Sequence, residues 1–216
     1  MPRTEYAVTP LERAEERGAI AALARSFFDD AMFSWVAPDP IRRARMLEHL
    51  MRASLVDSRP FGEMWVARPA AGERRPDGPV AAVALWLPPT GYPRGTRRDL
   101  GYAARTVRAA PAVGRRLPHV VRLLNRLDAV HPHEPHWYLA VLGTDPSFQR
   151  TGAGTALLEP VLARVDAEGL PAYLETQKEA NLAWYGRFGF DVVERVDVGP
   201  CPPIWTMRRA ERAPTP

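Results

Sequence analysis

The residues best suited to chemistry lie in one short segment, Q-R-T-G-A-G-T, which runs from Gln149 to Thr155. Gly152 and Gly154 stand immediately before a run whose apolar residues recur on one helical face, so the segment is predicted to open a helix. The first N–H groups of a helix have no internal partner, and the helix dipole favours negative charge there. Glycine also lets a ligand approach the backbone, because it has no Cβ. The segment is therefore predicted to bind an anion, and a phosphate suits it best.

Two of the three kinds of phosphate-binding loop that compete for this segment fail on the residues present. A P-loop requires a lysine after its last glycine, and Thr155 follows Gly154. A dinucleotide-binding fingerprint requires a third glycine where Leu157 stands, although Glu175 lies at about the right distance to imitate its ribose-binding acid. The glycines of that fingerprint also follow their strand at once, whereas here a polar connection intervenes.

A strand must deliver the segment, and residues 137–142 supply it. The run W-Y-L-A-V-L is short and apolar or aromatic, and Gly143 with Asp145-Pro146 ends it. An apolar run bounded by turn residues is typical of a buried strand. Gly143 indicates a bulge or a close approach of another group to the backbone.

The rest of the chain alternates between helical and extended patterns. The expected helices span 14–28, 41–56, a stretch directly after Gly154, and 181–188. The other expected strands span 5–9, 64–67, 80–87, 170–176, 190–196 and 203–208. Residues 88–135, rich in arginine, are expected to form a helical insert or flap around two short helical patterns. We expect a single domain over 1–210 and a frayed tail over 211–216.

Composition excludes several classes of protein. The 216 residues are 46% hydrophobic and 25% charged, as in an ordinary globular chain with a sizeable core. No apolar run approaches the length of a membrane span and no export signal is visible, so a cytoplasmic protein without membrane contact is expected. The single cysteine, Cys201, fits a reducing compartment. The net charge of +4 comes almost wholly from arginine, with Lys178 the only lysine, and no nucleic-acid-binding motif accompanies it.

Two motifs give the chain a specific resemblance. Residues 149–154 match the pattern Q/R-x-x-G-x-G/A, and here the chain resembles the GNAT superfamily of acetyl-CoA-dependent N-acetyltransferases. Residues 174–176 followed by N-L-A-W-Y-G-R-F-G-F over 181–190 are similar to the strand and the N-x-x-x-Y-x-x-x-G-F motif of the same family, in the right order. The run 134–185 also resembles puromycin N-acetyltransferase and its bacterial relatives, and the rest of the chain resembles them more loosely.

The resemblance implies the GNAT fold. This is an α/β (α+β) arrangement in which helices flank a mixed, mostly antiparallel sheet of six to seven strands. In the family the fourth and fifth strands splay apart after a bulge, and acetyl-CoA binds in the gap. The implied co-substrate is therefore acetyl-CoA. The implied donor-binding residues are Leu142, Gly143, Thr144, Gln149, Arg150, Thr151, Gly152, Ala153, Gly154, Thr155 and Asn181.

The resemblance also implies a general acid and leaves the general base open. Tyr185 matches the tyrosine that usually protonates the leaving thiolate, and a phenol can do so at small cost; a core tyrosine is the alternative. The base must take a proton from the acceptor ammonium. Glu175, beside the splay, is the first candidate, and Glu134, His136 or ordered water are others. A purely structural Glu175 at a strand end is an equal alternative.

Acceptor contacts are expected at the end of the first helix, which in puromycin N-acetyltransferase and its relatives helps to form the acceptor pocket. The corresponding residues are Phe28, Asp29, Asp30 and Trp35. The two aspartates would attract a cationic amine, or would be a solvated pair that ends a helix. An aspartate stands where the puromycin enzyme has an aromatic residue, which argues against puromycin itself as the acceptor.

The expected function is acetyl transfer to the primary amine of a small molecule, antibiotic-like or metabolic, by direct attack in a ternary complex. Acetylation of protein lysines or N-termini is an alternative, and so is a non-catalytic protein that only binds acetyl-CoA. No metal is expected, because no cysteine or aspartate completes a ligand set around His131, His133, His136 and Glu134. A monomer or homodimer is expected, without nucleic acid as a partner.

Overall fold

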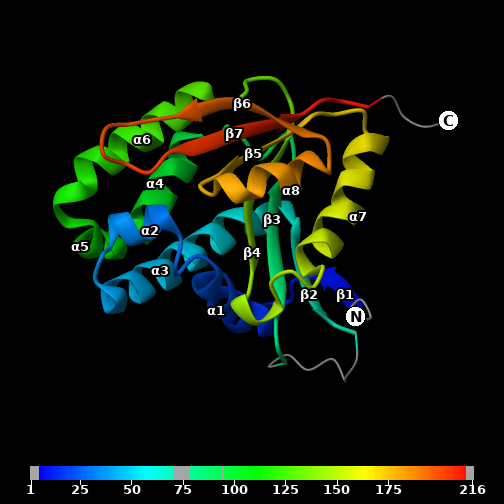
Figure 1. Cartoon of the computed structure of the whole chain (residues 1–216), viewed down its shortest axis with the longest axis horizontal. Coiled ribbons are helices and arrows are strands. Elements are labelled where there is room, and N and C mark those ends of the chain that lie inside the picture. The colour runs from blue at the N-terminus through cyan, green and yellow to red at the C-terminus, as the bar shows by residue number, and fades with distance from the viewer. Residues whose placement is uncertain (1–4, 71–77, 94, 213–216) are drawn as a thin grey trace.

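Seven strands form one sheet in the computed structural model, which describes residues 5–70, 78–93 and 95–212. Figure 1 shows the sheet in the middle of the molecule with helices on both faces. Its order is β1-β2-β3-β4-β5-β7-β6. The strands are β1 (Tyr6–Pro10), β2 (Met64–Pro69), β3 (Ala82–Leu87), β4 (Trp137–Thr144), β5 (Ala172–Thr176), β6 (Phe190–Val196) and β7 (Ile204–Arg209). The last four residues of the expected frayed tail, 213–216, lie outside the described residues.

Every pair of neighbouring strands is antiparallel except β4 and β5. Their parallel pairing is short and joins residues 137–139 to residues 172–174. Beyond this point β4 continues to Thr144 along β3, and β5 continues to Thr176 along β7. The two strands therefore separate. This confirms the expected mixed, mostly antiparallel sheet and its splay.

A bulge in β4 lies at the start of the splay. Leu139 opposes Trp86 of β3 and Val141 opposes Leu85, so Ala140 is the extra residue. The bulge is thus at Ala140, and not at Gly143, where the sequence also allowed one.

Gly143 instead allows side chains of a neighbouring helix to approach the backbone of β4 closely, which was the other expectation for this glycine. A Cβ built on it would overlap Oγ of Ser26 and lie 2.7 Å from Cδ2 of Leu23. The missing side chain lets the helix that carries Leu23 and Ser26 pack directly on the backbone of β4.

Two hydrophobic clusters, one on each face of the sheet, hold the helices. All six residues of β3 are buried, and its side chains alternate between the clusters. Val83 and Leu85 belong to one, and Ala82, Ala84 and Trp86 to the other. Such a strand, buried on both faces, explains why its sequence is apolar throughout.

The first cluster is covered by α1 (Glu16–Ser26), α2 (Ala31–Val36) and α3 (Pro40–Ser58), and the second by α7 (Ala153–Ala167) and α8 (Leu182–Gly186). The apolar face expected for the helix after the glycines is buried in the second cluster. Within the described ranges, no helix is long and apolar enough to cross a membrane.

The short helix α2 was not expected. The sequence predicts one helix over 14–28 that stops before Asp29-Asp30, whereas α1 already ends at Ser26 and Asp30 begins a new helix. The Asp30 carboxylate accepts a hydrogen bond from the N–H of Met32 at 2.9 Å, and so acts as the N-cap of α2. The pair that seemed to stop one helix therefore starts another.

The described residues of the insert between β3 and β4 form three α-helices where two helical patterns were expected: α4 (Thr96–Thr106), α5 (Ala110–Val113) and α6 (Leu117–Val130). Pro111 and Pro118 stand in the first turns of α5 and α6, where proline fits because its missing N–H needs no partner. Arg98 fixes α4 to α3 with two hydrogen bonds to the Asp57 carboxylate, of 2.6 and 2.7 Å.

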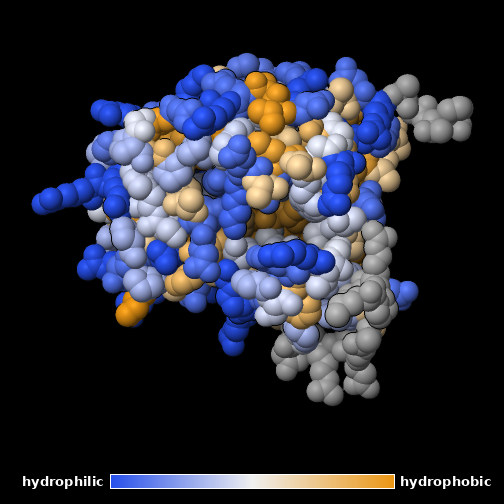
Figure 2. All heavy atoms as spheres, in the orientation of Figure 1, coloured by the Kyte–Doolittle hydropathy of each residue, from blue (hydrophilic) through white to orange (hydrophobic). Residues whose placement is uncertain are grey.

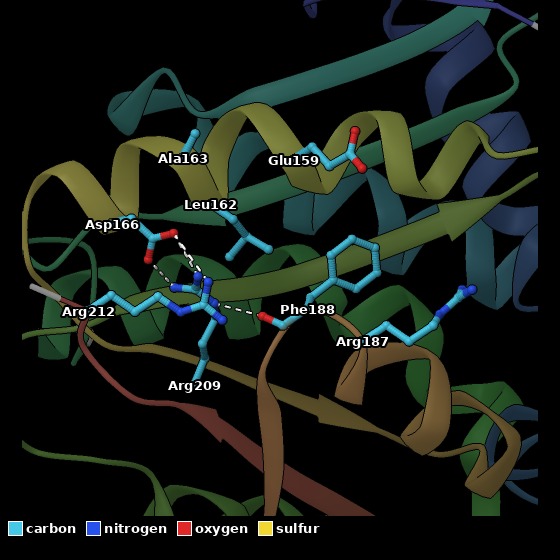
Figure 3. Close-up of a pocket in the computed structure, with 8 residues that line it drawn as sticks. All are labelled: Glu159, Leu162, Ala163, Asp166, Arg187, Phe188, Arg209 and Arg212. Atoms are coloured by element: carbon cyan, nitrogen blue, oxygen red, sulfur yellow. Dashed lines mark hydrogen bonds and ion pairs between the residues drawn. The ribbon is translucent and has the colours of Figure 1, made fainter. Parts of the chain in front are cut away.

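The end of β7 is tied to α7 by one buried arginine. Figure 3 shows the Arg209 guanidinium between the carboxylate of Asp166 and the carbonyl of Phe188, beside a small pocket of about 260 Å³. Its bonds to Asp166 measure 2.5 and 2.7 Å, and that to Phe188 measures 2.8 Å. The hydrogen bonds from Arg209 lower the pKa of Asp166 below its ordinary value. The contact clamps β7 to α7 and to the turn before β6.

Candidate active site

The splay of β4 and β5 opens a cleft of about 770 Å³. The end of β4 lines one side, the end of β5 with α8 lines another, and the N-terminus of α7 lines a third. In Figure 2 the surface is hollowed between α8 and the loop that follows β4, and apolar atoms show in its depth. All expected donor-binding residues line this cleft: Leu142, Gly143, Thr144, Gln149, Arg150, Thr151, Gly152, Ala153, Gly154, Thr155 and Asn181. The structure thus brings them together, and their contacts with a donor stay a prediction.

The loop before α7 has an uncommon backbone conformation. Arg150 has φ 63° and Gly152 has φ 101°, both in the left-handed region. A non-glycine residue rarely adopts such an angle, and those that do cluster at ligand-binding sites. The Gly152 carbonyl accepts the N–H of Ala156 at 3.0 Å, which is the first bond of the helix. The N–H groups of residues 153–155 precede that bond, so the helix offers them no acceptor.

Side chains hold this loop in place. The hydroxyl of Thr151 donates to the carbonyl of Phe148 at 2.5 Å, and the hydroxyl of Tyr6 in β1 lies 2.5 Å from Oγ1 of Thr151. Because the Thr151 proton goes to that carbonyl, Tyr6 is the donor of the second bond. Thr151 therefore shapes the loop with its side chain and leaves the backbone to face the cleft.

Asp145 fixes the turn at the end of β4. Its carboxylate accepts the N–H of Ser147 at 3.0 Å and Nε of Arg25 in α1 at 2.6 Å. Burial acts to raise the pKa of Asp145, but the hydrogen bonds from Ser147 and Arg25 outweigh it and lower the pKa. The turn therefore carries a fixed negative charge that is neutralised by α1.

Gly154 lies where β4 and α8 approach the start of α7. A Cβ on this residue would stand 3.4 Å from Oγ1 of Thr144 and 3.4 Å from the Trp184 ring. Both distances are ordinary van der Waals contacts, so a methyl group fits. A larger side chain would enter the space between these two elements.

Tyr185 and Asn181 belong to the α8 side of the cleft. Tyr185 is buried, with its ring edge-on to Trp184 at 4.8 Å and to Phe190 at 6.0 Å, and it lines the cleft. Burial raises its pKa well above the ordinary value, so the phenol keeps its proton. Asn181 donates from Nδ2 to Oγ1 of Thr176 at 3.1 Å, which ties the start of α8 to the end of β5.

Glu175 is the first residue of β5 after its pairing with β4 ends, and it lines the cleft. The hydroxyl of Tyr138 in β4 donates to its Oε2 at 2.8 Å, and Nδ1 of His131 lies 3.6 Å from its Oε1. The sequence analysis did not give Tyr138 or His131 a role at this carboxylate. Tyr138 pairs with Tyr173, two residues before Glu175, so a parallel register was the signal that placed it on the same face.

The two other candidates for the base lie away from the cleft. Glu134 is exposed and forms an ion pair with Arg208 at 3.4 Å. His136 is buried, and its Nδ1 lies 2.7 Å from the Glu134 carbonyl. Burial lowers the pKa of His136. Neither residue lines the cleft, because the turn that carries them precedes β4 at the end opposite the splay.

One of the four expected acceptor residues lines the cleft, and the other three lie elsewhere. Asp30 is 1% exposed and lines the cleft together with Phe27 and Ser26. Phe28, Asp29 and Trp35 do not line it. Phe28 packs under the Arg43 guanidinium at 4.6 Å, Trp35 packs against His119 and Arg116 of the insert, and Asp29 is exposed. Of the four expected acceptor residues, Asp30 alone therefore lines the cleft.

Asp30 has an unusual environment for a carboxylate. Burial raises its pKa, against the opposing effects of the Met32 N–H and of Lys178, which also lines the cleft. The Met32 N–H and Lys178 therefore offset only part of the effect of burial on this carboxyl.

A search of the described residues for three or more histidine, cysteine, aspartate or glutamate side chains able to hold a metal ion finds no such group. His131 and His136 instead face each other, with their Nε2 atoms 3.0 Å apart.

The family model described as Acetyltransferase (GNAT) family matches residues 24–190. The chain therefore belongs to the GNAT family of acetyltransferases. It is 25% identical over 197 residues to an uncharacterized N-acetyltransferase of Schizosaccharomyces pombe, covering 83% of this chain and 72% of that protein.

Two solved structures share the fold. A structure from Corynebacterium glutamicum, described as histone acetyltransferase HPA2 and related acetyltransferase, is 25% identical with a TM-score of 0.67, covering 98% of this chain and 99% of that one. Arylalkylamine N-acetyltransferase 2 from Aedes aegypti is 13% identical with a TM-score of 0.61, covering 95% of this chain and 98% of that one. The second likeness is one of fold alone.

Proposed function

We propose that this chain is an acetyl-CoA-dependent N-acetyltransferase that acetylates the primary amine of a small molecule, antibiotic-like or metabolic, by direct attack in a ternary complex. The observation that carries the proposal is the convergence of three features on one cleft: the first turn of α7, the Glu175 carboxylate and the Tyr185 phenol. The first suits a phosphate, the second can accept a proton and the third can donate one.

The residues present fit acetyl-CoA. When bound, it supplies an acetyl group activated on sulfur, together with a diphosphate. The N–H groups of residues 153–155 are suited to that diphosphate, because they carry the positive end of the α7 dipole. Gly154 keeps side-chain atoms out of the gap between Thr144 and Trp184. β4 beyond Leu139 is not paired with β5, so its backbone groups on that side are available to an extended arm.

Two side chains divide the proton transfers. Glu175 removes a proton from the acceptor ammonium, which frees the nitrogen lone pair for attack. Tyr185 gives its proton to the leaving sulfur and regains one from the nitrogen, which loses its second proton as the amide bond forms. Burial disfavours a thiolate as well as a phenolate, so the raised pKa of Tyr185 does not prevent that transfer.

The acceptor proposed is a compact cationic amine. Asp30 places a carboxylate in the cleft, and Phe27 adds an aromatic ring beside it. A concave site suits a small ligand, whereas a peptide requires an open groove with free backbone partners. The likeness to puromycin N-acetyltransferase rests on residues 134–185 and adds to this proposal only the class of acceptor. The single cysteine and the absence of a spanning helix from the described ranges fit a cytoplasmic enzyme, acting as monomer or homodimer.

Acetylation of protein amines is the second candidate. The Corynebacterium glutamicum structure, similar along nearly all of both chains, is described as a histone acetyltransferase HPA2 and related acetyltransferase. That description favours a peptide acceptor, whereas the concave shape of the cleft favours a small molecule.

Release of the CoA thiol from acetyl-CoA, measured against a panel of small amines and of histone-like and ribosomal peptides, separates these functions. The proposal requires kcat/KM for small aromatic or aminoacyl-type amines to exceed that for every peptide. If peptides are acetylated and no small amine is, the protein is instead a protein acetyltransferase. Acetyl-CoA binding without thiol release on any acceptor makes the chain a binding protein.

A further inference from the structure

A buried imidazole lies next to Glu175 and does not line the cleft. His131 caps the C-terminus of α6, and its side chain is 2% exposed. Three tyrosine rings enclose it, at centroid distances of 3.7 Å for Tyr92, 4.5 Å for Tyr173 and 4.7 Å for Tyr138. Its position between a reactive carboxylate and the protein interior calls for a chemical explanation.

The positions of the protons on the two histidines follow from their partners. The Glu134 carbonyl can only accept a hydrogen bond, so Nδ1 of His136 must carry a proton toward it, over 2.7 Å. A neutral His136 then has a lone pair on Nε2. The Nε2 of His131, 3.0 Å away, must therefore be the donor of the bond between the rings. This leaves Nδ1 of a neutral His131 without a proton.

The bare Nδ1 of His131 faces Oε1 of Glu175 at 3.6 Å. The other carboxylate oxygen, Oε2, already accepts the hydroxyl proton of Tyr138 at 2.8 Å. A lone pair facing an ionised carboxylate oxygen is unfavourable, and one proton placed between them makes the contact attractive. The geometry thus leaves room for one proton at this contact.

We propose that His131 is the positioning residue that receives, through Glu175, the proton removed from the acceptor. The inference rests on the proposed function and deepens it. An N–H bond of the acceptor ammonium breaks as an O–H bond forms on Glu175. That O–H bond then breaks as Nδ1 of His131 gains the proton. The products are a neutral amine, a Glu175 carboxylate and a His131 imidazolium, and the proton later returns to water through the same carboxylate.

Three features around His131 can each interact with a cation placed there. The C-terminus of α6 carries the negative end of a helix dipole. The Tyr92 ring is stacked on the imidazole, and aromatic faces attract cations. The Glu175 carboxylate then forms an ion pair with it. The titratable and charged groups around His131 and its partner His136 are Tyr92 with its partner Asp128, Tyr138, Tyr173, Glu175, Glu134 and Arg208.

The transfer needs only a small movement. The 3.6 Å separation is an ion-pair distance, and a hydrogen bond requires the two atoms to approach by about 0.7 Å. Glu175 lies where β5 no longer pairs with β4, so its side chain can make that approach. Catalytic hydrogen bonds are often long before substrate binds.

The test compares two acceptors of the same shape, an alkylamine that is protonated at pH 7 and a fluorinated analogue that is mostly neutral. In His131→Asn, kcat for the alkylamine is expected to fall about 100-fold near pH 7, and the loss to shrink as pH rises and the free amine becomes neutral. The neutral analogue is expected to lose about twofold or less. His133→Asn, an exposed histidine in the same turn, is the matched control and should match wild type.

If His131 were only structural, His131→Asn would lose the same factor in kcat for both amines. Equal losses in a variant that is still active would overturn this inference and leave the proposed function standing. If none of the amines supports thiol release by the wild-type protein, the proposed function is overturned, and this inference with it. If His131→Asn does not fold, long-range ¹H–¹⁵N NMR of the wild type decides. We expect the Nε2–H tautomer for His131 and the Nδ1–H tautomer for His136; the reverse pair would contradict the proton positions.

Discussion

The hydroxyl of Tyr138 donates a 2.8 Å hydrogen bond to Glu175 across the point where β4 and β5 stop pairing. Tyr138 belongs to the paired part of β4, whereas Glu175 is the first residue of β5 beyond it. The bond therefore holds the carboxylate at the closed end of the splay. Glu175 reaches the cleft from there while its second oxygen faces the buried histidine His131.

The anion site predicts a difference between two substitutions at Gly154. Gly154→Asp places a carboxylate near the expected phosphate, so acetyl-CoA should no longer raise the Tm, as a ligand that binds the native state otherwise does. Gly154→Ala should retain most of the shift, because its Cβ fits 3.4 Å from Thr144 and Trp184. Thermal-shift measurements over a range of acetyl-CoA concentrations check both. An aspartate variant stabilised as much as wild type would show that the phosphate lies elsewhere.

The general acid is tested by Tyr185→Phe, which removes a hydroxyl and little volume. The Tm and its rise with acetyl-CoA should persist, while kcat falls by about 100-fold or more. Tyr102→Phe, in α4 and outside the cleft, is the control for loss of a phenol and should leave kcat unchanged. An unaltered kcat in Tyr185→Phe would make Tyr185 a packing residue.

The acceptor wall predicts that Asp30 and Asp29 behave differently. Asp30→Asn keeps an N-cap for α2, since asparagine caps as well as aspartate, but removes a negative charge from the cleft. KM should rise about tenfold for cationic acceptors, with much less change for neutral ones. Asp29→Asn should change neither, because Asp29 is exposed and does not line the cleft. Steady-state kinetics on paired charged and neutral amines decide, and equal effects of the two variants would contradict the assignment.

The clamp between α7 and β7 predicts an acid-dependent stability. Asp166→Asn should lower the free energy of unfolding at pH 7 by about 2 kcal/mol, because buried Arg209 loses a charged partner. The pKa of Asp166 is depressed below 3.8 in the folded chain, so its contribution is present above that pH and is lost as pH falls through the folded value. Wild type and variant should therefore converge below about pH 4.

Denaturant unfolding at a series of pH values measures this convergence. Asp197→Asn removes a carboxylate from an exposed pair with Arg195 and should change little at any pH. A constant gap between wild type and Asp166→Asn down to pH 2 would show that the stabilisation is not electrostatic.

The sequence could predict that the expected donor-binding residues lie together, because most of them are close together in the chain. A strand, a turn, Gly152 and a helix determine the local conformation, whatever packs around them. The predicted ends of the last two strands, 190–196 and 203–208, also agree to within about one residue with β6 and β7, because glycine or proline bounds both strands. Gly143 was compatible with either a bulge or a close approach of another group, and the sequence alone could not choose between them; the structure has the close approach.

The acceptor side and the histidine pair could not be predicted in the same way. Asp30 starts a helix where the sequence suggested the end of one, because a capping residue looks the same in sequence as a residue that ends a helix. Phe28 and Trp35, on either side of it in the chain, do not line the cleft. His131 approaches Glu175 only because α6 ends beside β5, so residues far apart in the chain meet through tertiary packing.

The cleft also holds a built-in chemical label. Lys178 lines it and is the only lysine of the 216 residues, so the side chains offer an amine-reactive ester a single target. Whatever fills the cleft next to that amine slows the reaction at this one position. Mass spectrometry of the peptide that carries Lys178 can therefore follow occupancy of the cleft by footprinting, without a tag, a dye or an engineered residue.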